Sequence, residues 1–291
     1  MSVRSVISCT LLLVASTTAT AQDRIQWKFS TGDTLNYKIL QKMDTSTKLG
    51  QQIIKQSVLQ EIQMSWKTVG NGASSTVIEQ VFDRVKLKME GGAAGEVSFD
   101  SAKPQETDNP VIAAMAKSFS SIVGEKFQLN MRPSGAVTDV KIPKKLLDAV
   151  QDSQAGREGV LTEQMLKDMM KKSAVMLPEN AVSVGDKWKT NQDVDMPFGK
   201  MSINSVMTYQ KKEDGIATIN FTPTVTIKPR EGIPVTVELS SAAGRGQILF
   251  DLNKGVVSTS QLVLKLELNI TTNGQKIPQV ILNETLMKLS N

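Results

Sequence analysis

Polar and apolar residues alternate along most of the chain. After Gly32-Asp33, apolar residues recur at Leu35, Tyr37, Ile39 and Met43, with polar residues between them. Apolar residues at every second position lie on one face of a β-strand. We expect further strands in the alternating runs at 54–66, 77–89, 127–131, 137–140, 201–209, 217–227, 235–239, 247–252, 262–270 and 278–289. In the run at 77–89, Val77 and Val81 are expected on the same face as Val85, Leu87 and Met89.

Turn signals separate these runs and predict that successive strands are antiparallel. Asn71-Gly72, Asp214-Gly215 and Asn273-Gly274 accept the positive φ angles of a type I′ turn, which closes a two-residue hairpin. Pro133-Ser-Gly135 predicts another tight hairpin. Because proline has no backbone N–H to donate, Pro223 predicts a bulge or a sheet edge within its strand.

Three stretches have helical spacing instead. Asn109-Pro110 is a helix cap followed by apolar residues three and four apart, among them Phe119. Pro143 opens a second helical stretch that extends to about residue 154. A third helix is expected from about residue 160 to 174, preceded by Gly156 and Gly159 as a hinge, and we expect it to cover the concave face of a sheet. Its apolar side carries Leu161, Met165, Leu166, Met169 and Met170.

The second half of the chain repeats landmarks of the first in the same order. Gly185-Asp186 corresponds to Gly32-Asp33, Asp214-Gly215 to Asn71-Gly72, and the hairpin at 249–257 to that at 127–137. The predicted fold class is α+β and mainly antiparallel β: duplicated curved meander sheets, half-barrel-like, with a helical insert between the two copies. The predicted boundaries are 22–142 for the first copy, 143–176 for the insert and 177–291 for the second copy.

The N-terminus predicts export. Arg4, an apolar run ending at Ala15 and the small residues Ala19-Thr-Ala21 form a signal peptide over 1–21, cleaved between Ala21 and Gln22. The apolar run is about ten residues, short of the ~20 that span a bilayer, so no transmembrane segment is expected after cleavage. The only cysteine, Cys9, leaves with this segment. Export without disulfides is typical of a bacterial periplasmic or extracellular protein.

Three motifs resemble a known family. They are the Gly-Asp-x-Leu/Trp strand openings, the Phe-x-Leu-x-x-x-Pro-x-Gly-x-Val hairpin at 127–137, and the Leu-Pro-x-x-x-Val-x-Val-Gly-Asp-x-Trp joint at 177–188. Together they are similar to a bacterial exported family catalogued only as a domain of unknown function. The motifs are turns and strand starts, so the resemblance implies no catalytic residues. More loosely, curved sheets with helices are similar to periplasmic lipoprotein and lipid carriers, an analogy of fold alone.

Composition excludes several classes of chemistry. The chain has no histidine, which removes histidine-based triads and zinc sites, and no basic stripe accompanies its +5 formal charge, so nucleic-acid binding is not expected. Asp193 and Asp195 could hold a hard cation, but the other ligands of a calcium loop are absent and a solvated strand end is the better interpretation. Asp33 and Asp186 are expected to fix turns through their own backbone. We predict no enzyme, metal site or cofactor.

Two functional hypotheses remain. The first is an exported non-enzymatic protein that holds an apolar ligand, a lipid or acyl group, between curved sheet and helices. The second is a structural or assembly module of the cell envelope that binds another protein, for example through the edge at Pro223. Trp27, Trp66 and Trp188 fit core packing or a sugar or lipid site. The methionine-rich helix fits core packing or an adaptable binding face, and the candidate ligand-binding residues are Phe119, Leu161, Met165, Leu166, Met169 and Met170.

Overall fold

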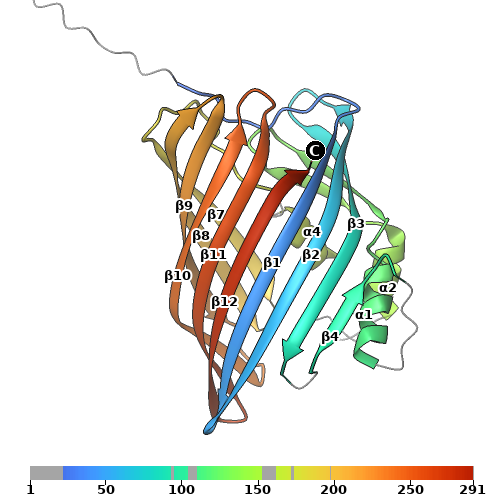
Figure 1. The fold of residues 1–291 in the computed structure, drawn as a ribbon, viewed down its shortest axis with the longest axis vertical. Coiled ribbons are helices and arrows are strands. Elements are labelled where there is room, and N and C mark those ends of the chain that lie inside the picture. The colour runs from blue at the N-terminus through green and yellow to red at the C-terminus, as the bar shows by residue number, and fades with distance from the viewer. Residues whose placement is uncertain are drawn as a thin grey trace, which may run out of the picture.

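A single curved antiparallel sheet dominates the computed structural model, which describes residues 22–92, 95–103, 110–152, 162–171, 174–196 and 198–290 (Figure 1). The strands are β1 (Thr34–Leu49), β2 (Gln52–Asn71), β3 (Thr76–Gly91), β4 (Val97–Asp100), β5 (Lys126–Met131), β6 (Val137–Lys141), β7 (Lys187–Met196), β8 (Gly199–Glu213), β9 (Ile216–Pro229), β10 (Val235–Asp251), β11 (Val256–Thr272) and β12 (Gln275–Ser290). The helices described are α1 (Pro110–Ser120), α2 (Lys144–Asp152) and α4 (Glu163–Lys171). The prediction of a mainly antiparallel β protein is confirmed.

The first and last strands meet in the middle of this twelve-stranded sheet. The strand order is β6-β5-β3-β2-β1-β12-β11-β10-β9-β8-β7, with β4 paired to β3 outside this path. The pairing of β1 with β12 runs from Asn36 opposite Ser290 to Thr47 opposite Gln279. The two halves of the chain therefore lie side by side and form one continuous sheet.

A bulge in β3 changes which residues of this strand face the core, so one prediction is wrong. Val77 and Val81 were expected on the same side as Val85, but the β2–β3 register shifts by one residue between Gln63 and Met64 of β2. One extra residue exchanges the two faces of a strand. Before the bulge it is therefore Ile78, 0 % exposed, and not Val77, that points into the core.

The turn at Asn71-Gly72 also differs from its prediction. β2 ends at Asn71 and β3 begins at Thr76, so the loop has four residues, and neither Asn71 nor Gly72 has a positive φ. A bond from the Gly72 amide to the Ser75 carbonyl (2.8 Å) closes the loop instead. The predicted type I′ geometry is found in the other two turns, where both residues have positive φ: Asp214 (49°) with Gly215 (78°), and Asn273 (48°) with Gly274 (75°).

The two Gly-Asp turns have the same hydrogen bonds. The Ser30 amide donates to Oδ2 of Asp33, and the Ser183 amide donates to Oδ2 of Asp186, each at 2.8 Å. In both turns the preceding glycine has a φ near that of its counterpart, 95° and 98°, and donates to a carbonyl of the neighbouring strand. The prediction that each aspartate fixes a turn through its own backbone is confirmed.

Bulges also recur in the same order in both halves. The β2–β3 register shifts between Thr68 and Gly70, and the β8–β9 register between Tyr209 and Lys211. Further along each half, the β5–β6 and β10–β11 hairpins have bulges as well. A hydroxyl on the second strand bonds to a carbonyl on the first at each of these two bulges: Thr138 Oγ1 to the Asn130 carbonyl (3.2 Å), and Ser258 Oγ to the Leu249 carbonyl (3.0 Å).

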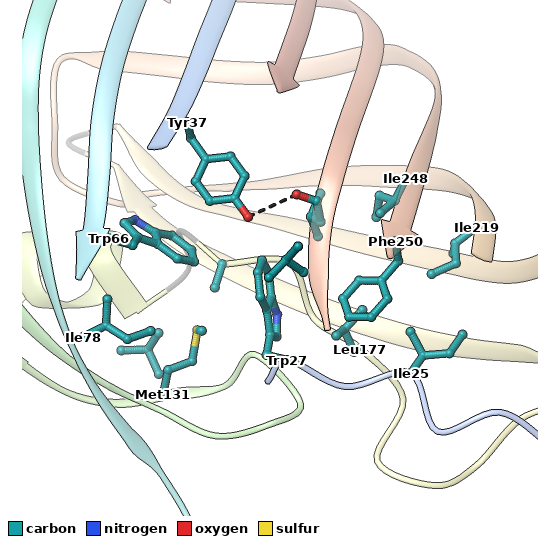
Figure 2. Close-up of a cluster of buried hydrophobic side chains, with 14 of the residues drawn as sticks. Ile25, Trp27, Tyr37, Trp66, Ile78, Met131, Leu177, Ile219, Ile248 and Phe250 are labelled. Atoms are coloured by element: carbon teal, nitrogen blue, oxygen red, sulfur yellow. Dashed lines mark hydrogen bonds between the residues drawn. The ribbon is translucent and has the colours of Figure 1, made fainter. Parts of the chain in front are cut away.

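The buried core lies at one end of the sheet, where two connecting segments cross it. Residues 22–33 and 174–186 run across this end, and Trp27 lies among strand residues that include Trp66 and Phe250 (Figures 1 and 2). The Trp27 amide donates to the Pro133 carbonyl at 2.8 Å. Trp27 and Trp66 are each 3 % exposed, so the prediction that they are core residues is confirmed for these two, whereas Trp188 is only partly buried. We call this end the core end.

Glycines in two hairpin turns permit this crossing. A Cβ on Gly135 would lie 2.2 Å from the Val175 carbonyl oxygen, and a Cβ on Gly255 would lie 2.4 Å from the Lys28 side chain. Both glycines also have positive φ, so any side chain would be strained as well as blocked. The opposite end, where hairpins turn at residues 49–52 and 272–275, has no comparable crossing segment among the described residues; we call it the hairpin end.

The helices lie beside the outer strands of the sheet. α4 mainly contacts β6 and β7, the two outermost strands, and α1 contacts β4 (Figure 1). α2 buries Leu146 and Val150 against Phe127 of β5. The predicted third helix extended from 160 to 174, and its hinge glycines Gly156 and Gly159 lie outside the described residues. No helix in the described part of the chain is long and apolar enough to cross a membrane.

Candidate functional site

One face of the curved sheet carries the core, and we call it the inner face. Cross-strand partners share a face of a sheet, so Tyr37, paired with Met64 and Leu289, assigns the alternate positions of every other strand. Toward the hairpin end the inner face carries aliphatic and sulfur-containing residues interspersed with uncharged polar ones. The apolar ones on the central and following strands include Ile39, Met43, Val58, Ile62, Ile281, Met287, Leu262, Leu266, Leu239, Ile227, Ile203 and Met201.

Charge is almost absent from this face. Among the register-paired positions of the described strands, the inner face has a single charged residue, Lys212, which lies at the core end opposite Ala217. Its Nζ donates to Oδ1 of Asp23 (2.6 Å), and the Tyr209 hydroxyl donates to Oδ2 of Asp23 (2.8 Å). Burial raises the pKa of Asp23, but the bonds from Lys212 and Tyr209 outweigh it and hold this pKa below its usual value. Burial and the nearby Asp23 raise the pKa of Tyr209.

Exposure divides the inner face into two parts. At the core end, Tyr37, Ile219 and Phe250 are each 1 % exposed or less. Toward the hairpin end, many residues of the same chemical type, such as Ile62 and Leu266, are only partly buried, whereas Val237 and Leu268 are buried there as well. The main helix contacts reach β4, β6 and β7 but not the central strands. A partly exposed apolar face of this kind can mark an interaction site.

Uncharged polar residues on the inner face concentrate on β2, β1 and β12, where the halves join. Gln41 lies opposite Gln60 on one side and Thr285 on the other. Gln41 Nε2 donates to Oδ1 of Asn283 at 2.8 Å. These side chains can donate and accept hydrogen bonds without introducing a charge.

The ladder between β9 and β10 stops halfway along the two strands. Their pairing runs from Ile216 opposite Asp251 to Phe221 opposite Gly246 and does not continue, although β9 extends to Pro229 and β10 begins at Val235. From Thr222 onward, β9 pairs with β8 alone. The prediction of a sheet edge at Pro223 is confirmed for this half of the strand.

A cavity lies where this pairing ends. Its volume is about 580 Å³, within the ~300–1,000 Å³ range of small-molecule sites. The inner face contributes Phe221, Gly246, Leu262 and Thr285 to its lining, and the outer face contributes Asn220, Thr222, Arg245, Gln247, Gln261, Val263 and Glu284. Seven of the eleven lining residues are outer-face positions, and each of the other four lies next to one of them in the chain, so the cavity lies on the outer face.

The structure divides the sequence-predicted site residues between two places. Phe119 stacks on Phe99 of β4, with ring centroids 5.1 Å apart, and lines a separate pocket of about 400 Å³ beside α1. Leu166 and Met170 of α4 pack against the cluster of Phe127, Leu146 and Val150. The side chains of Met165 and Met169, and all of Leu161, lie outside the described residues, as does Ala21 before the predicted cleavage site; Gln22 is the first residue described.

The carboxylate pair on β7 supports the interpretation of a solvated strand. Asp193 lies on the outer face, where Lys200 Nζ approaches Oδ2 at 2.6 Å and Ser202 donates to Oδ1 at 2.7 Å. The bond from Lys200 is the main reason that the pKa of Asp193 is lowered. This carboxylate is thus engaged by neighbouring side chains.

Sequence reasoning missed the cavity and the uncovered part of the inner face. The alternation of Leu262, Leu266 and Ile270 was visible, but it does not reveal which stretch of an apolar face other elements cover. Pro223 was the one local signal for the break between β9 and β10. The glycines of β10 that approach β9 closely, Gly244 and Gly246, were not recognised.

Comparison with known proteins gives a family without an assigned activity. A model of a family of unknown function (DUF6263) matches residues 73–257, more than half of the chain. The predicted resemblance to a family of unknown function is confirmed. A search of curated proteins finds no match.

Solved structures give only distant likenesses. Lipovitellin, in a structure described by its lipid–protein interactions, is 11 % identical with a TM-score of 0.49, and covers 91 % of this chain and 26 % of its own, so this chain spans about a quarter of lipovitellin. An outer membrane channel from Pseudomonas putida is 8 % identical (TM-score 0.26, covering 91 % and 98 %). A protein of the DUF1329 family from Desulfovibrio piger is 10 % identical (TM-score 0.14, covering 88 % and 85 %).

Proposed function

The chain belongs to the family of unknown function DUF6263, so its role has to be argued from its own residues, and we propose that it is a non-enzymatic protein that binds an apolar ligand on the inner face. The observation that carries the proposal is the nearly charge-free, partly exposed aliphatic surface toward the hairpin end. The ligand class is a lipid or acyl chain.

The energetics favour such a ligand. Each methylene moved from water to an apolar surface contributes about 0.8 kcal/mol, so a long acyl chain can be held without specific bonds. An ionised group on the same face would cost free energy unless it were paired. The single charged inner-face residue in the described strands, Lys212, is already bonded to Asp23 at the core end. With no histidine in the chain, this surface supports binding better than acid–base catalysis.

A matched pair of substitutions on β2 tests the proposal. Val58 lies on the inner face, opposite Met43, whereas its neighbour Leu59 lies on the outer face and is 48 % exposed. We expect Val58→Glu to weaken binding of a fluorescent fatty-acyl probe at least about tenfold, because a charge is placed in the apolar contact. Leu59→Glu should leave the affinity unchanged. Equal affinity of the two variants, or no saturable binding by the parent, would contradict the proposal.

We also propose that the fold arose by duplication of a meander. The recurrence of the Gly-Asp turn bonds and of the bulges, in the same order in both halves, supports this origin. The joint at 177–188 would begin the second copy, and the helices between β6 and β7 would be the insert. Export, with cleavage after Ala21, is part of the same proposal; N-terminal sequencing of the secreted form should begin at Gln22, and a retained Met1 would contradict it.

Helix α4 is the proposed lid at the sheet margin. It contacts both outermost strands, and its Leu166 and Met170 are flexible apolar residues that repack readily. The double variant Met165→Ala with Met169→Ala tests this role. If α4 is a lid, the double variant should keep most of its free energy of unfolding and take up the probe differently. If α4 is a core helix, each change should lower the free energy of unfolding by about 2–5 kcal/mol.

A second function, binding of another envelope protein, is favoured by the break between β9 and β10. Residues 222–228 of β9 lack ladder partners on the β10 side, and an unpaired strand edge can accept an added strand from a partner. Mass spectrometry of the natively purified protein separates the two functions. A co-purifying lipid supports the carrier, and a stoichiometric protein partner supports the assembly module.

A further inference from the structure

We propose that two hairpin tips at the hairpin end dock the protein on the surface of an anionic lipid bilayer. The β1–β2 tip consists of residues 48–55 and the β11–β12 tip of residues 271–276, each around the turn between its strands. Because β1 pairs with β12, the two tips belong to adjacent hairpins, and both lie at the end of the sheet opposite the crossing segments (Figure 1). Such docking goes beyond the proposed acyl binding and can be measured without it.

Large aliphatic side chains are exposed on the β1–β2 tip. Ile53 is 60 % exposed, more than any other large hydrophobic residue in the described part of the chain, and Leu49 is 38 % exposed. Ile53 lies on the outer face, opposite Lys48, and Leu49 lies opposite Gln52 at the turn itself. Transfer of these side chains from water to an apolar phase is favourable in free energy.

Positive charge surrounds these aliphatic side chains. Lys48 is the cross-strand partner of Ile53, and Lys55 lies two residues beyond Ile53 on the same face. Lys276 adds a third cation on the adjacent β11–β12 tip, and all three lysines are exposed. The tips therefore present cations and apolar surface together.

No acidic side chain within the tips balances this charge. Residues 45–56 and 271–280 contain no aspartate or glutamate. Asp44 and Glu90 line a pocket together with Lys55, but each of them is bonded to another lysine, Asp44 to Lys42 (2.8 Å) and Glu90 to Lys88 (2.6 Å). The lysines of the tips can therefore meet an external anionic surface.

A bilayer with anionic headgroups fits both properties of the tips. Each lysine near such a surface contributes about fivefold to the affinity, and Ile53 can enter the boundary between headgroups and acyl chains. A soluble polyanion would engage the lysines but leave Ile53 and Leu49 in water. The inner face begins beside this tip at Ile54, opposite Thr47, so docking brings the inner face next to the bilayer.

Co-sedimentation of the secreted form with lipid vesicles tests the docking. We expect the protein to bind vesicles of equal parts phosphatidylcholine and phosphatidylglycerol at least about tenfold more tightly than vesicles of phosphatidylcholine alone. Added salt should weaken the binding, because it screens exposed charges. Equal binding to the two kinds of vesicle, or binding to neither, would overturn the docking.

Matched substitutions at the two ends of the sheet locate the docking surface. Ile53→Glu should weaken binding to the anionic vesicles at least about tenfold, because it replaces the inserted side chain by a negative charge. Val184→Glu makes the same change in charge at a core-end residue that is 54 % exposed, and it should leave vesicle binding unchanged. Both positions are exposed, so neither change should unfold the protein. Equal losses from the two variants would overturn the tip as the docking surface.

A second pair of variants tests the role of the lysines. Lys48→Gln with Lys55→Gln should weaken binding to the anionic vesicles at least about tenfold. The control, Lys67→Gln with Lys187→Gln, removes the same charge from exposed positions at the core end and should have little effect. An equal loss in the control would mean that net charge alone attracts the protein, and would overturn the docking. Because no acyl probe is present, that result would leave the proposed carrier function standing.

Discussion

The two ends of the inner face have similar side chains but differ in what covers them. At the core end, residues 22–33 and 174–186 cross the sheet, and residues such as Tyr37 and Ile219 are inaccessible to solvent. At the hairpin end the same strands continue with Ile62, Leu266 and similar residues, which remain partly exposed. Strand composition therefore does not decide which apolar surface becomes core. The connecting segments decide it, and the surface that they leave uncovered is available to a ligand.

The largest expected effect comes from removing the cover at the core end. Trp27 is 3 % exposed, stacks on Phe29 at 5.7 Å, and donates from Nε1 to the Val175 carbonyl. Trp27→Ala should lower the free energy of unfolding by about 3–5 kcal/mol, as for other buried aromatic residues. The control Ile281→Ala, at a partly exposed position toward the hairpin end, should cost about 1 kcal/mol or less. Urea denaturation measures both, and equal losses would remove the distinction between the ends.

A ligand bound at the hairpin end should stabilise the protein and protect the strands there, as the crossing segments do at the core end. A probe that binds only the folded protein, present at about 100 times its dissociation constant, should stabilise it by about 2.7 kcal/mol. Amide hydrogen exchange should slow in β1, β2 and β11 toward the hairpin end and stay the same near Tyr37. Protection confined to the core end would place the ligand elsewhere.

The polar cluster of Asp23, Tyr209 and Lys212 at the core end should contribute less to the free energy of unfolding than Trp27 does. Asp23 accepts bonds from Tyr209 and Lys212, and Tyr209 is 0 % exposed. Asp23→Ala leaves the buried hydroxyl without this partner, so we expect a loss of about 1–3 kcal/mol. The matched control, Asp193→Ala on the outer face, should leave the urea midpoint unchanged. If Asp23→Ala left the free energy of unfolding unchanged, apolar packing alone would stabilise this end.

The smallest expected effect concerns the charged outer face. The Lys38 ammonium, 3.0 Å from Glu61, is the main reason that the pKa of Glu61 falls from 4.5 to about 2. Because the folded-state pKa is lowered, the stability that Glu61 contributes is fully present above pH 4.5 and is lost as the pH falls toward 2. Thermal melts across this range should show a shallower acid decline for Glu61→Gln. An unchanged slope would mean that this ion pair contributes nothing.

Local patterns predicted much of the fold because they report on backbone geometry. The alternation around Leu35 and Tyr37, the turns at Asp214-Gly215 and Asn273-Gly274, and the hairpin at Pro133-Ser-Gly135 all appear in the structure. The errors occurred where a non-local contact decided the outcome. The bulge that exchanges the faces of β3 depends on its pairing with β2, and the loop after Asn71 is closed by a bond within it to Ser75.

The candidate site was harder to predict because no motif marks it. Its defining property, an apolar face without a cover, depends on where the crossing segments and α4 end relative to the curved sheet. Of the predicted ligand residues, Phe119 and Leu166 belong to separate side-chain clusters beside the outer strands. Only the irregularity at Pro223 pointed toward the cavity, and the sequence alone did not place Gly244 opposite it.

The pairing of β1 with β12 has a consequence for how the chain reaches its native state. Asn36 lies opposite Ser290, so the middle of the sheet joins residues that are almost the whole chain apart. Loop closure over such a separation is entropically costly, and proteins rich in distant contacts fold slowly. During synthesis, each half can form its own hairpins early, but the seam between them has to wait for the last strand to emerge. Until then both central edges are open, which makes this the stage at which a chaperone is most useful.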